Sequence, residues 1–440
     1  MKNRNLNYAL FFALFILLPS IAWAEGEKPK ENPAPEKAEV TDEESTRFTP
    51  SEDQPHRAGE THNQTGTIER GSPGDAVFRP PHEGHSVVTD SDVKVWVSGY
   101  LRSQYSHIMD DPDETDFVGR YDGFQMANAR LRFKGKSKDF WFMLSLDGAV
   151  DRRDSVNTST GETIVRLKDA YVSWRPHDAL HISTGQIRTP FDAYDMTSTS
   201  DLLFISRPLS SRGVKGVEGY NVEGLGTGRE VGLGINSEPL HLGFVPVSFS
   251  YNLAVTNGNN ANASLNDNDA LAFYGRLEMY VGEWLSLGGS VYSNEITYNE
   301  PPDELTEDRF GYSADIMFRS HNFLLIGQYI QVQSKFGDVS TEPERVARGY
   351  NAAVAYHLPY GLIPGYRFSY YDPTAEFETN DPTLNEQLLA DELMYHTMGL
   401  TWVAPASPFK LQLNYTMAQE PGGAVRVAND RADVVVQYRF

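Results

Sequence analysis

The run LHISTGQIR at residues 180–188 is followed by Thr189-Pro190-Phe191 and then by a long polar stretch. The first run has the length and the β-branched content of a strand, and the proline ends it. The next strand-like run, REVGLGI, begins only at Arg229. A connection of this length without regular structure is uncommon and is usually either functional or disordered. The chain on both sides of it reads as short strands separated by turns. We therefore predict an all-β fold, a transmembrane antiparallel barrel with residues 189–228 folded into its bore as a constriction loop.

The composition excludes several classes of protein. The chain has 440 residues, a formal net charge of −22 and no cysteine. The absence of cysteine excludes disulfides, thiolate catalysis and Cys-based zinc sites. The negative charge argues against a nucleic-acid partner, since such a partner needs a basic face. After the first twenty-odd residues, no apolar run approaches the ~18 residues of a helical membrane span. We expect no cofactor and no metal.

The N-terminus has the pattern of an export signal. Lys2 and Arg4 form a positive region, residues 9–18 are apolar, and Ala22-Trp23-Ala24 supplies a cleavage site. Such a segment is a signal peptide, here residues 1–24, and it is removed from the mature chain. A bacterial outer-membrane location is the expectation for an exported barrel.

Residues 25–92 differ in composition from the rest. They are rich in Pro, Glu, Gly and Thr and have few aliphatic residues. Such a segment cannot bury enough apolar surface to offset the entropy of ordering, so we predict a disordered, acidic periplasmic arm. Its histidines, among them His56 and His62, lack the spacing of a metal site and are read as solvated.

Residues 93–440 contain about sixteen strand-like segments, most of them near the ~10 residues that a tilted strand needs to cross a bilayer. Short turns, such as Lys136-Ser137-Lys138 and Glu238-Pro239, alternate along the chain with long polar loops, such as residues 108–123. A transmembrane barrel has this alternation because one rim carries periplasmic turns and the other carries external loops. A soluble sandwich gives no reason to sort loops in this way.

Alternation within the strands indicates what each face contacts. In residues 409–418, Phe409, Leu411, Leu413 and Tyr415 share one parity, and polar residues occupy the other. A period of two with one apolar side fits lipid outside and water inside.

The polar parity of residues 124–136 places Arg130, Arg132 and Lys134 in the bore, and Arg188 is a further basic candidate. Such a stripe could pass an anion from site to site. Alternatively, these side chains pair with acidic loop residues and brace the loop against the wall, since charge rings tune selectivity only where a pore is narrow.

The long insert carries charges of both signs, and a folded-in loop of this kind sets a transverse field and a size limit. An exposed outer loop is the alternative, but four apolar residues, Leu202-Leu203-Phe204-Ile205, favour packing on a wall. The charged candidates in the insert for the pore lining are Asp192, Asp195, Asp201, Arg207, Arg212 and Lys215.

Three motifs, ARLRF at 129–133, LKDAY at 167–171 and GQIRTPF at 185–191, together with GREVG at 228–232, resemble the phosphate-selective porin O and P family. The resemblance implies a sixteen-stranded outer-membrane barrel, a homotrimer, and a third external loop that narrows the pore. Terminal Phe440 resembles the signal that the outer-membrane assembly machinery reads. Phosphate-selective members are expected to have a strongly basic bore, whereas this chain is acidic and its insert holds as many carboxylates as bases. The resemblance therefore implies a porin, with phosphate as a hypothesis.

The predicted function is passive diffusion of small hydrophilic solutes or ions, including anions such as phosphate, through a lipid-embedded barrel. The alternative is a binding or scaffold barrel whose arm or external loops engage a partner. An enzyme would need a nucleophile, a base and an orienting group placed together, and no spacing around His107 or His396 indicates them. We therefore expect no catalysis.

Overall fold

The computed structural model describes residues 85–88, 93–109, 122–150, 163–214, 218, 222–243, 245–263, 265–266, 268–298, 305–336, 344–377, 391–421 and 429–440. The predicted signal peptide 1–24 and most of the predicted arm 25–92 lie outside these residues. Much of several predicted external loops also lies outside them, as does Lys215.

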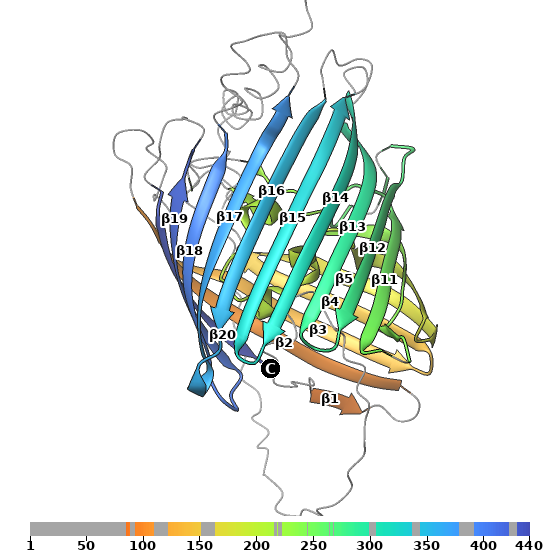
Figure 1. Ribbon diagram of the computed structural model, residues 1–440. Helices are drawn as coiled ribbons and strands as arrows, with labels where there is room; N and C mark the ends of the chain where they lie inside the picture. The colour runs from red at the N-terminus through yellow and green to blue at the C-terminus, as the bar shows by residue number, and fades with distance from the viewer. Residues whose placement is uncertain are drawn as a thin grey trace, which may run out of the picture.

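The described strands form a closed antiparallel barrel, as predicted (Figure 1). Sixteen strands make its wall, and β1 (His85–Val88) and β10 (Leu240–His241) are short additions to it. Barrel closure comes from β2 and β20, which pair from Tyr100 opposite Arg439 to Ile108 opposite Arg431. The wall strands are β2 (Val93–Ile108), β3 (Gly123–Ser137), β4 (Phe140–Val150), β5 (Thr163–His177), β6 (Leu180–Arg188), β9 (Arg229–Asn236), β11 (Val247–Thr256), β12 (Ala272–Val281), β13 (Leu285–Tyr298), β14 (Leu305–Ser320), β15 (Phe323–Phe336), β16 (Arg345–Tyr356), β17 (Leu362–Phe377), β18 (Leu393–Val403), β19 (Phe409–Gln419) and β20 (Arg431–Arg439).

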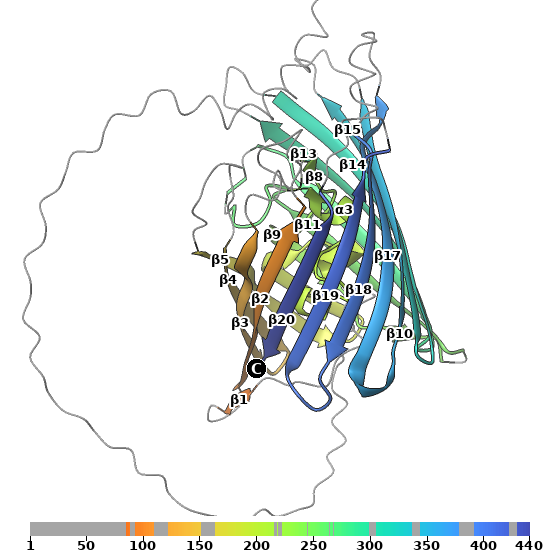
Figure 2. The same cartoon turned by 90° about the vertical axis from the view of Figure 1, so that its left-hand side faces the viewer.

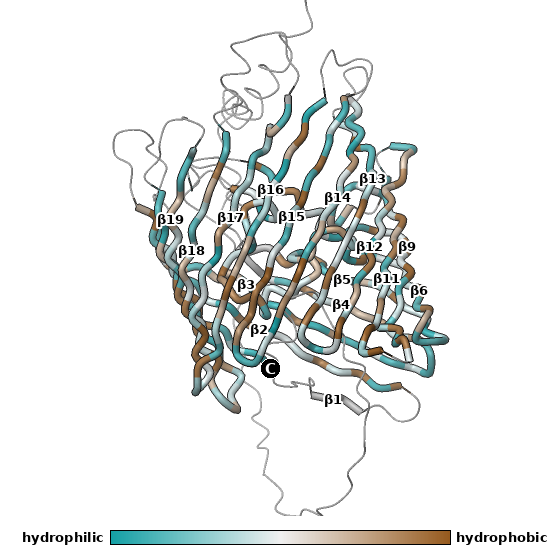
Figure 3. The backbone as a smooth tube through the Cα atoms, in the orientation of Figure 1, coloured by the Kyte–Doolittle hydropathy of each residue, from teal (hydrophilic) through white to brown (hydrophobic). Residues whose placement is uncertain are grey.

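The two faces of the wall separate apolar from polar residues. In β19, Lys410, Gln412 and Asn414 are buried, whereas Phe409 and Leu413 are exposed. The hydropathy of the backbone tube alternates along the strands in the same way (Figure 3). An outward row of exposed apolar side chains and an inward row of polar ones is the arrangement of a wall between lipid and water.

Short connections gather at one rim, where the C-terminus also lies (Figure 1). One turn differs from the sequence-based expectation. We expected it at Glu238-Pro239, but β10 continues the pairing with β11, and the turn is closed by the Leu242 N–H, which donates to the Val247 carbonyl at 3.0 Å. The proline, which has no N–H to donate, interrupts the ladder without ending it.

The edge of β2 that closes the barrel is paired in two parts, first with β20 and Phe440 and then with β1. The Gly99 N–H donates to the Phe440 carbonyl at 2.8 Å, and the Phe440 N–H donates back to the Gly99 carbonyl at 3.1 Å. Below this point β20 has ended, and β1 pairs with Lys94–Val97. Since β3 occupies the other edge of β2, β1 continues the sheet beneath the C-terminus. This strand falls within the predicted arm 25–92.

The described residues of the insert 189–228 lie inside the wall and form several short elements. Its short elements appear within the barrel in Figure 2. They are α2 (Ala193–Met196), η1 (Thr199–Asp201), α3 (Leu209–Arg212), β7 (Gly213–Val214) and β8 (Val222–Glu223). In the part of the chain that the structure describes, no helix is long and apolar enough to cross a membrane.

Candidate functional site

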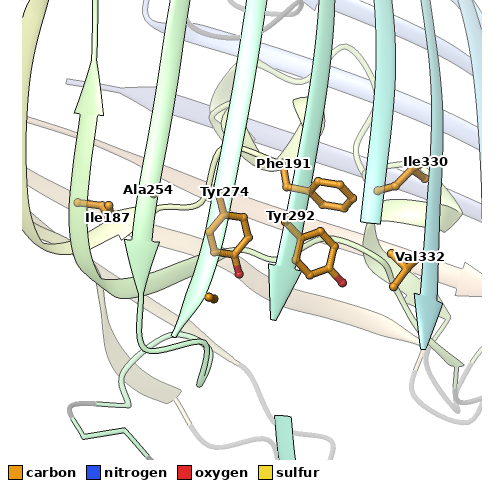
Figure 4. Packing of buried hydrophobic residues seen from close by; sticks show 8 residues of the cluster. Ile187, Phe191, Ala254, Tyr274, Tyr292, Ile330 and Val332 are labelled. Carbon is orange, nitrogen blue, oxygen red and sulfur yellow. The ribbon is translucent and has the colours of Figure 1, made fainter. Parts of the chain in front are cut away.

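Aromatic packing fixes the start of the insert to the wall. The Phe191 side chain is fully buried, and its ring centroid lies 4.4 Å from that of Tyr292, edge to face. Tyr292 in turn stacks on Tyr274 of the neighbouring strand, and the Phe191 ring of the insert lies beside Tyr292 in Figure 4. The Ser313 hydroxyl donates to the Phe191 carbonyl at 2.9 Å. Such contacts hold the chain that leaves β6 against β12–β14, across the bore.

The apolar run at 202–205 is buried, as its composition predicted. Phe204 packs with Leu324 and Ile326 of β15, and the Arg367 guanidinium carbon lies 4.8 Å from the centre of the Phe204 ring. Polar side chains of the wall also bind backbone carbonyls of this run. For example, Gln412 donates to the Leu203 carbonyl at 2.9 Å. The insert therefore packs on the wall with both its side chains and its backbone.

The predicted basic stripe on β3 enters the bore, but its three members have different surroundings. Arg130 is buried and donates to the Asp147 carboxylate at 2.7 Å. Arg132 donates to the Ser198 hydroxyl of the insert at 2.8 Å. The Lys134 ammonium lies 4.9 Å from the centre of the Trp141 ring, nearer the short-turn rim.

Arg188 and Arg229 meet at one carboxylate. The Asp169 carboxylate accepts from Arg229 Nε at 2.8 Å and lies 3.6 Å from Arg188 Nε. Arg188 also donates to the Met196 carbonyl of the insert, and its side chain keeps 26% exposure, against 4% for Arg130. Arg229 was not among our predicted site residues, although it belongs to the GREVG motif that carried the resemblance.

Asp192 is fully buried between the insert and β15. Its Oδ1 accepts from the Tyr194 N–H at 2.9 Å, which caps α2, and from Gln328 Nε2 at 2.6 Å. Burial, and secondarily the charge of Asp195, raises the pKa of the Asp192 carboxyl to about 6. Its position is that of a structural brace.

The other predicted charges of the insert are held in ion pairs. Asp195 lies 3.3 Å from Arg207, and Asp201 lies 2.5 Å from Arg439 of β20. Arg212 binds both carboxylate oxygens of Glu218, at 2.8 and 2.9 Å, and Glu218 also contacts Arg431. The three arginines of the first two pairs and of the Glu218 pair stay partly exposed, at 21% for Arg207 and 18% each for Arg439 and Arg212, and Asp195 is 17% exposed. The pore-lining role of all the predicted residues stays a prediction.

Three further wall cations bind the insert through backbone carbonyls. Arg102 donates to the Ile205 carbonyl at 3.2 Å, Arg367 to the Ser206 carbonyl at 2.7 Å, and Lys410 to two carbonyls at 2.9 Å each. Within the described ranges, none of the three forms an ion pair with a carboxylate. In the sequence, these three residues are marked only by their alternation with apolar residues. Every other polar residue that faces the bore shows the same alternation, so it does not indicate which of them bind the insert.

In the described part of the chain, no group of three or more His, Asp or Glu side chains could hold a metal ion.

Comparison with known proteins supports the resemblance seen in the sequence. A family model described as phosphate-selective porin O and P matches residues 100–300, which contain the insert and the motifs named above. A comparison with curated protein sequences gives no match.

Several solved structures share the barrel. OmpF of Salmonella typhi in complex with daunomycin is 13% identical, with a TM-score of 0.54, over 81% of this chain and 100% of that one. The anion-selective porin of Comamonas acidovorans is 14% identical, with a TM-score of 0.51, over 79% of this chain and 100% of that one. The outer membrane channel DcaP of Acinetobacter baumannii is 14% identical, with a TM-score of 0.51, over 81% of this chain and 100% of that one. At these identities the likeness shows the fold alone.

The closed barrel with its charged, folded-in insert is that of a bacterial outer-membrane porin, a channel for small solutes. Within that class, the family match over 100–300 supports assignment to the phosphate-selective porin O and P family, and this family and this fold are those of channels.

Proposed function

We propose that this channel prefers small anions, and that inorganic phosphate is the first anion to test. The observation that carries the proposal is the charge balance of the bore at the level of the insert. Arg130, Arg132, Arg188 and Arg229 lie around two carboxylates, Asp147 and Asp169.

Three cations on β2, β17 and β19 add positive charge where these strands contact the insert. Arg102, Arg367 and Lys410 are bound by carbonyl oxygens, which orient them without cancelling their charge. A narrow region with an excess of fixed positive charge favours anions and repels cations. The acidic composition of the whole chain does not contradict this, since the field inside a pore follows the nearest charges and is screened from distant ones.

The charged groups at the start of the insert do not offset this excess of positive charge. Asp195 and Arg207 form an ion pair that has no net charge, and the Asp192 carboxyl group is buried away from water. The partly exposed Arg188 is then the wall cation best placed to meet an entering anion. Arg188 binds both Asp169 and the insert, so its guanidinium is held in place before an ion arrives.

The test is the reversal potential of single channels of the mature chain in a planar bilayer under a KCl gradient. We expect the reversal potential to have the sign of a pore that prefers anions. Arg132→Gln removes one charge without breaking an ion pair, and a unit charge about 8 Å away in water is worth roughly 0.5 kcal/mol, or about a twofold loss of preference. Lys335→Gln, at the external end of β15 and 62% exposed, is the charge-matched control and should leave the preference unchanged.

Added inorganic phosphate should reduce the chloride current of the wild type more than that of Arg132→Gln. A reversal potential of the cation-preferring sign would refute the proposed selectivity while leaving the channel itself in place.

A homotrimer is a further proposal. One structural neighbour, OmpT of Vibrio cholerae, is described as a trimer form, and it is 10% identical to this chain with a TM-score of 0.51. Sedimentation of the detergent-solubilised protein tests the assembly. Recognition of Phe440 by the assembly machinery is likewise a proposal, and a Phe440→Ala variant with poor membrane insertion would support it.

A further inference from the structure

A cluster of basic and aromatic side chains lies toward the short-turn end of the bore, away from the contacts of the insert. The Trp141 and Trp96 rings stack with their centroids 6.1 Å apart and their planes 11° apart. Three cations surround the Trp141 ring, each 4.9 Å from its centre, namely the ammonium groups of Lys134 and Lys136 and the guanidinium of Arg175. We call these five residues the mouth cluster.

The strand register places the cluster on the inner face of the wall. Trp96 lies opposite Lys134, and Trp141 lies opposite Lys136, so each pair shares a face of the sheet. Lys134 has the parity of Arg132 and Arg130 along β3, which is the bore side. The cluster is next to the β3–β4 turn, and short turns mark the periplasmic rim of such barrels.

The cluster carries more positive charge than its surroundings neutralise. Among the described residues, neither Lys136 nor Arg175 forms an ion pair with a carboxylate, and the Arg175 side chain donates to the Ser173 hydroxyl at 3.3 Å. Cation–π contacts hold the cations at the ring without cancelling their charge. Three cations around one ring repel one another, and an acidic group near them would relieve that repulsion.

Strand β1 brings the N-terminal part of the chain to the same place. His85 lies opposite Val97 and Ser86 opposite Trp96, so the preceding residues join the barrel beside the cluster. Neighbouring strands are about 4.8 Å apart, and β1 and β4 are three steps apart, which makes roughly 15 Å.

The preceding sequence has the complementary charge. Residues 25–84 contain 14 acidic and 7 basic residues, and Asp42-Glu43-Glu44 form an uninterrupted acidic run. A random coil with the number of residues from Glu44 to His85 would have a root-mean-square reach of roughly 32–38 Å, which exceeds the distance to the cluster. Tethering at this length gives a local concentration on the order of millimolar.

We propose that the acidic segment 39–44 of this chain docks on the mouth cluster, with its carboxylates against Lys136, Arg175 and Lys134. The occupant is the chain's own arm, because the arm is tethered beside the cluster and carries the opposite charge. This inference does not require the anion preference proposed above, since it concerns a different level of the bore.

Crosslinking tests the proposal directly, because the natural chain has no cysteine. The full-length mature chain would carry Glu43→Cys with Lys138→Cys, which lies in the β3–β4 turn beside the cluster. The matched control carries Glu43→Cys with Lys335→Cys, at the far end of the barrel. We expect an intramolecular disulfide in the first pair only, decreasing as salt is raised because exposed charges are screened. Equal crosslinking in both pairs, or none in the first, overturns the proposal.

A second measurement does not depend on engineered thiols. Neutralising the run with Asp42→Asn, Glu43→Gln and Glu44→Gln should increase the chloride conductance, since the cluster is then open to ions. The control, Glu52→Gln, Asp53→Asn and Glu60→Gln, removes the same charge from the same arm and should change it less. Equal effects would overturn docking by segment 39–44. If the mouth cluster binds free anions and not the arm, inorganic phosphate should quench the tryptophan fluorescence of both variants to the same extent, and that result would also overturn the proposal. The sign of the reversal potential is a separate result, so either proposal can fail alone.

Discussion

Gln328 of β15 donates to the Asp192 carboxylate at 2.6 Å, joining the wall to an insert residue 136 positions earlier in the chain. The same Asp192 oxygen accepts from the Tyr194 N–H and so caps α2. The preceding residue, Phe191, belongs to a buried aromatic cluster on the wall. The start of the insert is therefore fixed by one buried carboxyl group and one buried ring, and each can be tested separately.

The stability of the folded barrel should depend on the protonation of Asp192. Its carboxyl has an ordinary pKa of 3.8 and a pKa of about 6 in the folded protein. The folded state therefore binds the proton more tightly, and stability falls as pH rises from about 4 to about 6. Two pKa units correspond to about 3 kcal/mol at most.

Asp192→Asn mimics the protonated form and keeps an oxygen for the Tyr194 and Gln328 donors. We expect this variant to lose the pH dependence and to be at least as stable as the wild type at neutral pH. Asp195→Asn removes the neighbouring charge and should reduce the dependence only in part. The heat-induced loss of the folded form, followed between these pH values in detergent, measures both. An unchanged slope in Asp192→Asn would contradict the assignment.

Removing the Phe191 ring should loosen the insert and leave the wall intact. A buried Phe→Ala change costs about 3–5 kcal/mol, and here that loss falls on contacts between insert and wall. We expect a larger and noisier single-channel current from Phe191→Ala, with the barrel still folded. Leu277→Ala, at an outward position of β12 that is 58% exposed, removes apolar volume from the other face and should leave the current unchanged. Unaltered conductance in Phe191→Ala would mean that other contacts alone hold the insert.

Asp169→Asn should shift selectivity in the opposite direction to Arg132→Gln. The change removes the carboxylate that Arg229 and Arg188 share, so the bore gains net positive charge. By the same Coulomb estimate, the anion preference should increase about twofold. Asp308→Asn, an exposed position on β14, is the control for a carboxylate lost outside the bore. A decrease in preference would show that Asp169 acts mainly by holding the two arginines in place.

Closure of the barrel should be sensitive to Gly99. A Cβ at this position would lie 2.3 Å from the Arg130 carbonyl oxygen and 2.5 Å from the Phe440 ring. Gly99→Ala must therefore displace both the backbone of β3 and the terminal ring, and we expect a lower yield of folded barrel. Gly289→Ala, in β13, has no atom within 4 Å of the added carbon and serves as the control. Equal yields of the two variants would rule out a role for the close approach at the seam.

The sequence alone predicted the wall because its signals are local. Alternation is a property of each strand, and the sorting of short and long connections needs no knowledge of which strands pair. The burial of Leu202-Leu203-Phe204-Ile205 was predicted on the same ground, since an exposed apolar run of this length is unfavourable in water.

The partners of the charged residues could not be predicted, since they depend on register and on contacts far apart in the chain. Arg130 meets Asp147 because β3 and β4 pair in one particular register. Asp192 is buried against β15, whose Gln328 lies 136 positions later in the chain. Lys410 shows no local sign that it binds the insert.

The carbonyl of Ser200 accepts from Lys410, Gln437 and Arg439, which are 210, 237 and 239 positions later in the chain. Contacts of such separation form late, because the intervening chain must first be ordered. The same final strands also complete the seam with β2. The insert can therefore complete its contacts with the wall only when the last two strands are in place, so the strands that close the barrel also finish the anchoring of the loop inside it.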